Sequence, residues 1–406
     1  MEANKTMVEL SFGRVPVDRE ILRSITVGLD KVSSFLKKEY FDTFISHGGS
    51  KIKFITGKKG SGKSHLMKLL SFDALDSGFV TVELDSRSLL LSDLTNLYQA
   101  VFEKLDLDDL VRRSAVNMVS SIGYDYSIDN PRSFSSWLSD QGELSFYSKS
   151  EIRAALRKFY QENPNLDYNF AQILSLMASE YLGMFKLDGE TKDLVSKWLH
   201  ADKTVKLSAL RSTGLAGYKI GKSNARFLLR SLSELVHLAG YSGLFVSIDN
   251  LESMISTSSL NPVKYTKMRR DDGYEAVREL IDDIDTFRYF FLVFGFDRSL
   301  CDNEKNGFKS YQALWLRIQN EIVSKRVNLY VDLLDLDRIN TTLYTPSAIL
   351  DMSSRLTSLF SSYDISAVPM TDEDAKELMK EAKFGGTSLP LLVNRFTLKL
   401  DRKEEN

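Results

Sequence analysis

Cysteine and histidine are scarce in this sequence, and each shortage excludes a class of site. The 406 residues include one cysteine, Cys301, and four histidines. One thiol cannot form an intramolecular disulfide, and the histidines lack the spacing of a zinc site. The composition is therefore typical of a reducing compartment such as the cytoplasm. Cys301 is expected near a strand end, with no role as a nucleophile.

The sequence also lacks an excess of charge and a long hydrophobic run. Lysine and arginine number 53 against 55 aspartates and glutamates, which gives a net charge of −2. No overall field therefore attracts the chain to DNA or to an anionic membrane, and any DNA contact must be local. The longest apolar run, at residues 289–296, is far shorter than the ~20 residues that span a bilayer. Residues 1–7 lack the apolar stretch of a signal peptide, so we expect a cytoplasmic protein with no membrane partner.

What the sequence does contain is a phosphate-binding loop. Residues 57–64 read Gly-Lys-Lys-Gly-Ser-Gly-Lys-Ser, between the apolar residues 52–56 and a helix-like stretch at 65–70. In such a Walker A loop the glycines turn N–H groups toward a triphosphate, Lys63 reaches the β- and γ-phosphates, and the Ser64 hydroxyl binds Mg²⁺. The loop predicts a nucleotide-binding protein. The residues expected to bind the nucleotide are Gly57, Lys58, Lys59, Gly60, Ser61, Gly62, Lys63, Ser64 and His65.

A second apolar stretch, at residues 243–248, ends in Asp249 and matches a Walker B strand. In that motif the carboxylate lies at the carboxyl end of the strand and holds Mg²⁺ through water, opposite the serine of the loop. The alternative is a buried strand that simply leaves the sheet at a polar turn. With the loop present, we predict Ser64 and Asp249 as the Mg²⁺ ligands, and Lys63 and Asp249 as catalytic residues.

The alternation of strand-like and helix-like segments predicts an α/β fold with a parallel sheet flanked by helices. Further strands are expected at residues 79–84, 289–296 and 327–331. The long interval between the two motifs has a helical pattern, which indicates a large helical insertion, and the end of the chain indicates a small helical lid. The predicted division is a first part of the core at 1–105, the insertion at 106–240, a second part of the core at 241–340 and the lid at 341–406.

Two polar residues beyond the second motif each have two interpretations. Asp297 follows the strand-like residues 289–296 and is either a sensor of the γ-phosphate or the solvated end of a core strand. Arg317 lies on a helix-like stretch before the next expected strand. It is either an arginine finger that reaches a neighbouring subunit's phosphate or a surface, salt-bridging arginine. The first interpretation of Arg317 makes it a catalytic residue and implies a homo-oligomer.

Several short segments accompany the two motifs in a fixed order along the chain. They are Gly13-Arg14-Val15-Pro16, Thr26-Val27-Gly28, Trp198-Leu199, residues 239–244 and residues 307–314. With them the chain resembles, over most of its length, the ATP-binding proteins of the BREX bacteriophage-exclusion systems, a branch near the Orc/Cdc6-like AAA+ ATPases. The resemblance implies an AAA+ fold, ATP with Mg²⁺, and an accessory ATPase that joins other subunits in a defence complex acting on DNA.

The sequence departs from that pattern after Asp249. Such ATPases usually place a glutamate there to polarise the attacking water, whereas this chain has Asn250, whose amide cannot accept the proton. Loss of a general base lowers the rate about 10²–10⁴-fold, and Glu252 is the predicted catalytic replacement.

Two functions therefore stay open. One is an ATPase that remodels or loads a DNA-acting complex, which the intact loop, Asp249 and Arg317 favour; the other is a nucleotide-gated scaffold with little turnover, which Asn250 favours.

The lid and the surface complete the expectations. Residues 385–388 lack the arginine with which such lids often meet the nucleotide, and Arg395 lies about two helical turns later. Two basic clusters are candidates for DNA contact, although runs of this kind are usually solvated faces. The clusters are Lys264 with Lys267, Arg269 and Arg270, and Lys219 with Lys222 and Arg226.

Overall fold

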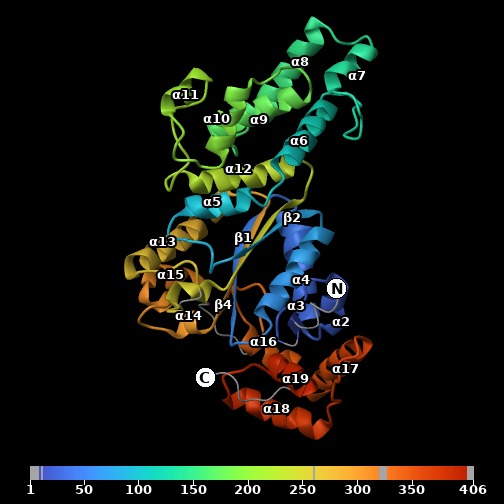
Figure 1. The fold of residues 1–406 in the computed structure, drawn as a ribbon, viewed down its shortest axis with the longest axis vertical. Coiled ribbons are helices and arrows are strands. Elements are labelled where there is room, and N and C mark those ends of the chain that lie inside the picture. Colours follow the sequence, from blue (N-terminus) through green and yellow to red (C-terminus); the bar gives the residue numbers. More distant parts are fainter. Residues whose placement is uncertain (1–8, 11, 259–260, 320–326, 400–406) are drawn as a thin grey trace.

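The core of the molecule is a five-stranded sheet in which every strand is parallel to its neighbours (Figure 1). The computed structural model describes residues 9–10, 12–258, 261–319 and 327–399. The strands lie in the order β2-β3-β4-β1-β5, and the prediction of an α/β fold with a parallel sheet is confirmed. Their bounds are β1 Ser50–Gly57, β2 Phe79–Asp85, β3 Gly243–Asp249, β4 Phe290–Asp297 and β5 Leu333–Asp335.

The prediction of a strand at residues 327–331 is wrong, because β5 begins only at Leu333. The carbonyl groups of residues 329–331 accept hydrogen bonds from the Lys53 ammonium, and not from a neighbouring strand. The first backbone bond to β1 is made by the Asp332 carbonyl, which accepts from Phe54 N–H at 2.8 Å. The apolar pattern before β5 therefore reflects packing against the core, not membership of the sheet.

Side chains that alternate along the strands build two cores, one on each face of the sheet. Along β4, Phe291 and Val293 face one side, and Phe290, Leu292 and Phe294 face the other. Both sets are buried because helices cover both faces, as is usual for parallel sheets.

Different helices cover the two faces. One face packs against α2 Arg19–Ile25, α3 Leu29–Leu36, the π-helix η1 Lys37–Ile45 and α4 Lys63–Asp76. The other packs against α5 Leu94–Phe102, α12 Ala225–Leu238, α13 Lys267–Asp283, α14 Ser299–Asp302 and α15 Gln312–Ile318.

The helices between α5 and α12 form a layer at one end of the molecule (Figure 1). Their apolar sides continue the core of the α5 and α12 face without a break, so this layer and the sheet share one core. Five of the helices begin at a side chain that accepts an N–H of the first turn, as good capping residues do; these residues are Asp106, Ser133, Ser145, Asp167 and Asp188. The helices are α6 Leu107–Ser121, α7 Phe134–Asp140, α8 Phe146–Leu156, the π-helix η2 Arg157–Gln161, α9 Tyr168–Tyr181, α10 Gly189–Leu199 and α11 Leu207–Ser212.

The C-terminal helices lie at the opposite end of the sheet (Figure 1). After β5 the chain forms α16 Leu336–Leu343, α17 Pro346–Ser362, α18 Asp372–Phe384 and α19 Leu389–Thr397. The last three build a third core with residues from the N-terminal lead-in, among them Leu10 and Ile25. The N-terminal lead-in and the C-terminal helices therefore pack together.

Lys53 is an unusual member of the central strand, because it is fully buried with 0% of its surface exposed. Its ammonium donates to the carbonyls of Leu329, Tyr330 and Val331 at 2.7–3.2 Å and lies 4.5 Å from the centre of the Tyr40 ring. Burial lowers the pKa of Lys53 to about 7, although Asp332 opposes the shift. The lysine thereby fixes the segment that leads into β5.

This burial makes stability depend on pH with a defined sign. Because the pKa of Lys53 falls from 10.5 in the unfolded chain to about 7 in the folded one, the unfolded state binds more protons in this window, and the free energy of unfolding rises with pH. Between pH 7 and pH 9 the Lys53 contribution to the urea-unfolding free energy should rise by about 2 kcal/mol. Lys53→Met should lack this increment, and an identical pH slope in the two proteins would contradict the assignment.

Candidate nucleotide-binding site

The site lies at the carboxyl edge of the sheet, where four of the five strands end in aspartate. These residues are Asp85 of β2, Asp249 of β3, Asp297 of β4 and Asp335 of β5, and β1 alone ends in glycine, at Gly57. In the ladder, Gly57 pairs with Asp297 and Asp85 pairs with Asp249. The phosphate-binding loop therefore begins at the end of β1, the strand of this sheet whose last residue has no carboxylate.

Positive φ angles shape the loop between β1 and α4. Gly60 and Gly62 have φ of +78° and +94°, values that side-chain-bearing residues rarely adopt. Space is a second constraint, because a Cβ on Gly60 would come within 2.4 Å of Leu391 Cβ, and one on Gly62 within 2.7 Å of Leu29 Cδ1. The loop ends at Gly62 as the N-cap of α4, so the N–H groups of the first turn of α4 face the loop.

Lys63 lies inside the curve of this loop. Its ammonium donates to the carbonyls of Gly57 and Lys58 at 2.8 and 3.0 Å, and it lies 3.8 Å from the carboxylate of Asp297. The end of β4 therefore faces the loop lysine, as a sensor position requires. Whether Asp297 acts as a sensor of the γ-phosphate stays a prediction.

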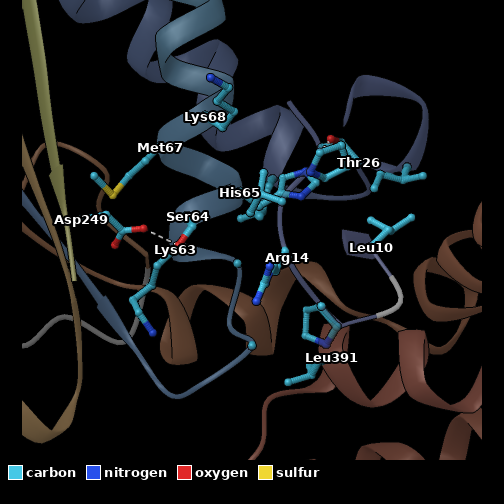
Figure 2. A pocket seen from close by; sticks show the side chains of 18 of the residues that line it. Leu10, Arg14, Thr26, Lys63, Ser64, His65, Met67, Lys68, Asp249 and Leu391 are labelled. Carbon is cyan, nitrogen blue, oxygen red and sulfur yellow. Dashed lines mark hydrogen bonds between the residues drawn. The ribbon is translucent and has the colours of Figure 1, made fainter. Parts of the chain in front are cut away.

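The hydroxyl of Ser64 donates to the Asp249 carboxylate (Figure 2). The other oxygen of that carboxylate accepts the N–H of Asn250 at 2.8 Å. A hydroxyl and a carboxylate are the oxygen ligands that Mg²⁺ prefers, usually one or two from the protein with water and phosphate as the rest. The pair thus fits an Mg²⁺ ion bound together with a nucleotide. Within the described part of the chain, no group of three or more His, Cys, Asp or Glu side chains forms a separate metal cluster.

Asn250 serves the backbone of the turn after β3. It adopts a left-handed conformation with φ of +61°, which asparagine tolerates better than most residues. Its amide interacts with Asp85, whose pKa is held low by Arg87 and Asn250 against the effect of burial. Asn250 therefore faces the edge of the sheet at β2.

Glu252 takes a place beside the loop. It lies on the short 3-10 helix η3, Leu251–Ile255, and its carboxylate accepts the N–H of Asp297 at 2.9 Å. Burial raises the pKa of Glu252, and Asp249 and Lys63 are close enough to act on it in opposite directions. The structure thus brings Glu252 together with Lys63, Asp249 and Asp297, and its role as a base stays a prediction.

A cavity of about 660 Å³ opens from the loop toward the N-terminal lead-in and α19. Its lining includes Lys63, Ser64 and Asp249 on one side, and Arg14 and Leu391 on the other (Figure 2). The lead-in contributes mainly apolar residues, which suits a flat nucleobase. The remaining lead-in residues of the lining are Leu10, Gly13, Val15, Pro16, Val17, Ile25, Thr26, Val27 and Leu29.

His65 connects the loop helix to this lead-in. Its Nε2 atom lies 2.7 Å from the Thr26 hydroxyl, which itself donates to the Leu22 carbonyl. Burial lowers the pKa of His65 to about 4, so the ring is neutral at physiological pH and offers no charge to a phosphate. Its visible role is to hold α4 against the lead-in.

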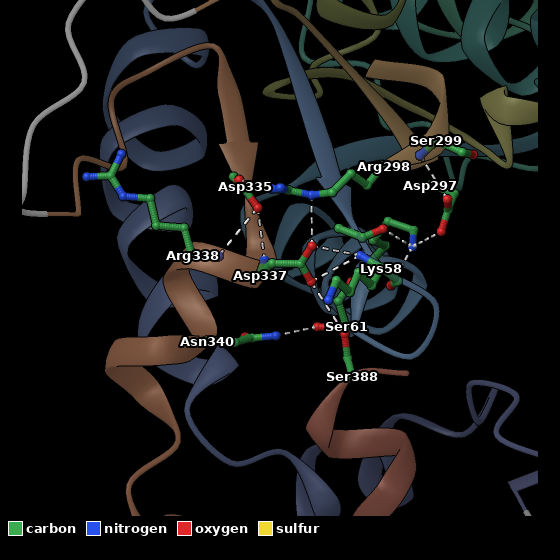
Figure 3. A network of polar contacts seen from close by, with 12 residues as sticks. Lys58, Ser61, Asp297, Arg298, Ser299, Asp335, Asp337, Arg338, Asn340 and Ser388 are labelled. Atoms are coloured by element: carbon green, nitrogen blue, oxygen red, sulfur yellow. Dashed lines mark hydrogen bonds and ion pairs between the residues drawn. The ribbon is translucent and has the colours of Figure 1, made fainter. Parts of the chain in front are cut away.

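Sequence reasoning missed the polar network behind the loop (Figure 3). Both carboxylate oxygens of Asp337, on α16, accept the Lys58 N–H at 3.0 Å. Asp337 also lies 3.0 Å from Arg298 Nε, and Arg298 pairs with Asp335 as well. Asn340 donates to the Ser61 carbonyl at 3.0 Å. The signal in the sequence was the pair Asp335 and Asp337 at the end of β5. The pair indicates a contact with the loop only once β5 is known to lie beside β1.

The C-terminal lid touches the loop directly through the glycine-containing turn before α19. Lys58 Nζ donates to the Gly385 carbonyl at 3.1 Å, and Ser388 N–H donates to the Lys59 carbonyl at 3.0 Å. Thr387 forms an isolated parallel bridge with Lys59. Arg395 lies on α19 but does not line the cavity.

Arg317 lies outside this constellation. On α15 it pairs with Asp282 of α13 and donates to the Ala313 carbonyl, and it does not line the cavity. Within one chain it is thus a salt-bridging arginine, and its action on a neighbouring subunit stays a prediction. Cys301 is buried, and burial raises the pKa of its thiol to about 12.

The two basic clusters differ in the structure. Arg226 pairs with Glu279 and Asp283, whereas Lys219 donates to a backbone carbonyl and Lys222 is exposed. At the start of α13, Lys264, Lys267 and Arg269 are exposed. In the described residues this cluster presents three exposed cations, and the other presents two, Lys219 and Lys222.

Comparison with known protein families identifies the family of this chain. The sequence model of the family described as BREX system ATP-binding protein BrxC/D matches residues 2–399. No curated protein and no solved structure matches the chain. Among the described helices, none combines the length and apolar character needed to cross a membrane.

The network behind the loop should contribute measurably to stability. Asp337→Asn removes the charge that Arg298 faces and weakens the acceptor for Lys58 N–H, so urea unfolding should show a loss of about 1–3 kcal/mol. The matched control is Asp351→Asn, which breaks an exposed i,i+4 pair with Arg355 on α17 and should cost no more than about 0.5 kcal/mol. Equal effects of the two changes would show that Asp337 does not anchor the loop.

Proposed function

This chain belongs to the family of BREX system ATP-binding proteins BrxC/D, and from that premise we propose that it is a Mg²⁺-dependent AAA+ ATPase that serves a DNA-directed phage-defence complex. The observation that carries the proposal is the contact of Ser64 with Asp249 beside Lys63 at the mouth of the cavity. A loop lysine, a loop serine and a strand-end aspartate are the three groups by which P-loop ATPases hold a nucleotide and its metal.

In this proposal each part of the cavity binds one part of ATP. The N–H groups from Gly60 to Ser64 surround the phosphates, and Lys63 neutralises the β- and γ-phosphates. Ser64 and Asp249 hold Mg²⁺, which supplies charge neutralisation of the transferred phosphoryl group. The apolar lead-in and the lid enclose the base.

Hydrolysis requires a base for the attacking water, and the candidate is Glu252, which does not line the cavity itself but lies close to Lys63 and Asp249. Its carboxylate is held by the N–H of Asp297, on the same side as Lys63. Burial raises the pKa of Glu252, which makes the carboxylate a better proton acceptor than an exposed one. In the step, the water oxygen bonds to the γ-phosphorus, the bond to the β-γ bridging oxygen breaks, and the water proton passes to Glu252.

A slow, switch-like protein is the second candidate, and Asn250 favours it. The residue after Asp249 is turned toward Asp85 and cannot act as a base, so turnover depends on Glu252 alone. The protein would then use bound ATP to fix its interface with copies of itself or with other defence subunits. The exposed cations at Lys264, Lys267 and Arg269 are the proposed contact with DNA phosphates.

Replacement of the loop lysine tests nucleotide binding. Lys63→Ala removes the ammonium aimed at the phosphates, so calorimetric titration with ATP and Mg²⁺ should show affinity reduced at least 100-fold. The control is Lys51→Ala. Lys51 lies at the start of β1, at the opposite end of the strand from the loop, and pairs with Asp332. This variant should bind ATP with the affinity of the wild type. Unchanged affinity in a folded Lys63→Ala protein would refute the site.

Replacement of the candidate base separates the two functions. Glu252→Gln keeps the hydrogen bond from Asp297 but cannot take a proton, so phosphate release should fall about 10²–10⁴-fold while ATP affinity stays the same. Asn250→Gly, which preserves the left-handed backbone, should leave the rate unchanged. If the wild type itself releases no phosphate above background, the switch is the better description, and brisk turnover in Glu252→Gln would assign the base elsewhere.

A further inference from the structure

The cavity has few cations that are free to meet a triphosphate. Lys68 pairs with Glu83, and Arg87 pairs with Asp85, while His65 is neutral. In the described part of the lid no arginine lines the cavity, since neither Arg355 nor Arg395 belongs to its lining. Yet a nucleoside triphosphate carries several negative charges, and Lys63 balances only one of them.

Arg14, in the lead-in, is the remaining cation of the lining. Figure 2 shows its side chain directed into the cavity that Lys63 and Ser64 also line. Within the described part of the chain, no carboxylate lies within ion-pairing distance of Arg14. An arginine with an unoccupied planar fork beside a phosphate-binding loop is well suited to a phosphate group.

Hydrogen bonds hold the backbone at Arg14 in one conformation, and this conformation orients the Arg14 side chain toward the cavity. Gly13 N–H donates to the Leu10 carbonyl at 2.9 Å and Arg14 N–H to the Glu9 carbonyl at 3.0 Å, the two bonds of a Schellman turn. Gly13 has φ of +71°, and a Cβ there would come 2.6 Å from Leu391 Cδ1. The turn is therefore pressed against the lid residue that also contacts Gly60 of the loop.

We propose that Arg14 binds the phosphate chain of the nucleotide from the lead-in side, and so supplies in cis the charge that an arginine of the lid supplies in related ATPases. The inference rests on the proposed function, since it requires a nucleotide in this cavity. In this proposal the lead-in binds the phosphates through Arg14 and contacts the nucleobase through its apolar residues. The lid then acts through Leu391, by holding Gly13 and the loop together.

The test is competition of ATP, ADP and adenosine against a fluorescent ATP analogue with Mg²⁺. Arg14→Ala should raise the Kd for ATP and for ADP about tenfold and leave the Kd for adenosine unchanged. Arg14→Lys, which keeps the charge without the planar fork, should fall between wild type and Arg14→Ala. Circular dichroism confirms that each variant is folded.

Two controls make the outcome decisive. Arg19→Ala removes a lead-in arginine that pairs with Asp76 outside the cavity and should bind ATP normally, and Arg395→Ala tests the lid directly. If Arg14→Ala binds ATP like the wild type while Lys63→Ala does not, the role of Arg14 is refuted and the nucleotide site stands. If Lys63→Ala also binds normally, the site itself is wrong. An equal loss for adenosine, or a loss confined to Arg395→Ala, would equally overturn the phosphate contact.

Discussion

The position of β1 between β4 and β5 is the constraint on which the site depends. In a parallel sheet all carboxyl ends meet at one edge, and here that edge carries Asp85, Asp249, Asp297 and Asp335 around the single glycine end of β1. The loop that follows Gly57 is thereby placed among acidic strand ends, each of which has a partner. Asp249 meets Ser64, and Asp335 meets Arg298.

The aspartates at this edge of the sheet contact different partners. Asp297 faces Lys63 through its side chain and Glu252 through its N–H, so one strand end touches both the loop cation and the candidate base. Asn250, one residue from Asp249, serves a left-handed turn instead. Glutamate at that position would be strained by roughly 1 kcal/mol, which gives a physical reason for the departure from the usual pattern.

The lid and the lead-in meet the loop at one side chain. Leu391 of α19 lies against Gly13 and against Gly60, where any larger residue would collide with it. Lys58 and Lys59 add hydrogen bonds to the turn before α19. The lid, the lead-in and the loop therefore meet around Leu391, a contact that would couple the nucleotide to the C-terminal helices in either proposed function.

The sequence by itself determined the local features. The Walker A loop, the apolar strand before Asp249 and the parallel α/β class follow from patterns within short segments, because glycine geometry and strand burial are local properties. The family follows from the order of such segments along the chain. The strand at 327–331 was predicted wrongly because apolar alternation does not reveal that Lys53 occupies its carbonyl groups.

Only the tertiary structure decided which distant side chains meet. Asp337 reaches the Lys58 N–H across 279 positions of sequence, and Glu252 reaches Asp297 across 45. Arg14 lines the cavity together with residues of the distant loop and of α19, and Arg317 pairs with Asp282 because α15 packs on α13. These contacts are set by how helices pack on the sheet, and packing depends on the whole chain, so no single segment carries the information.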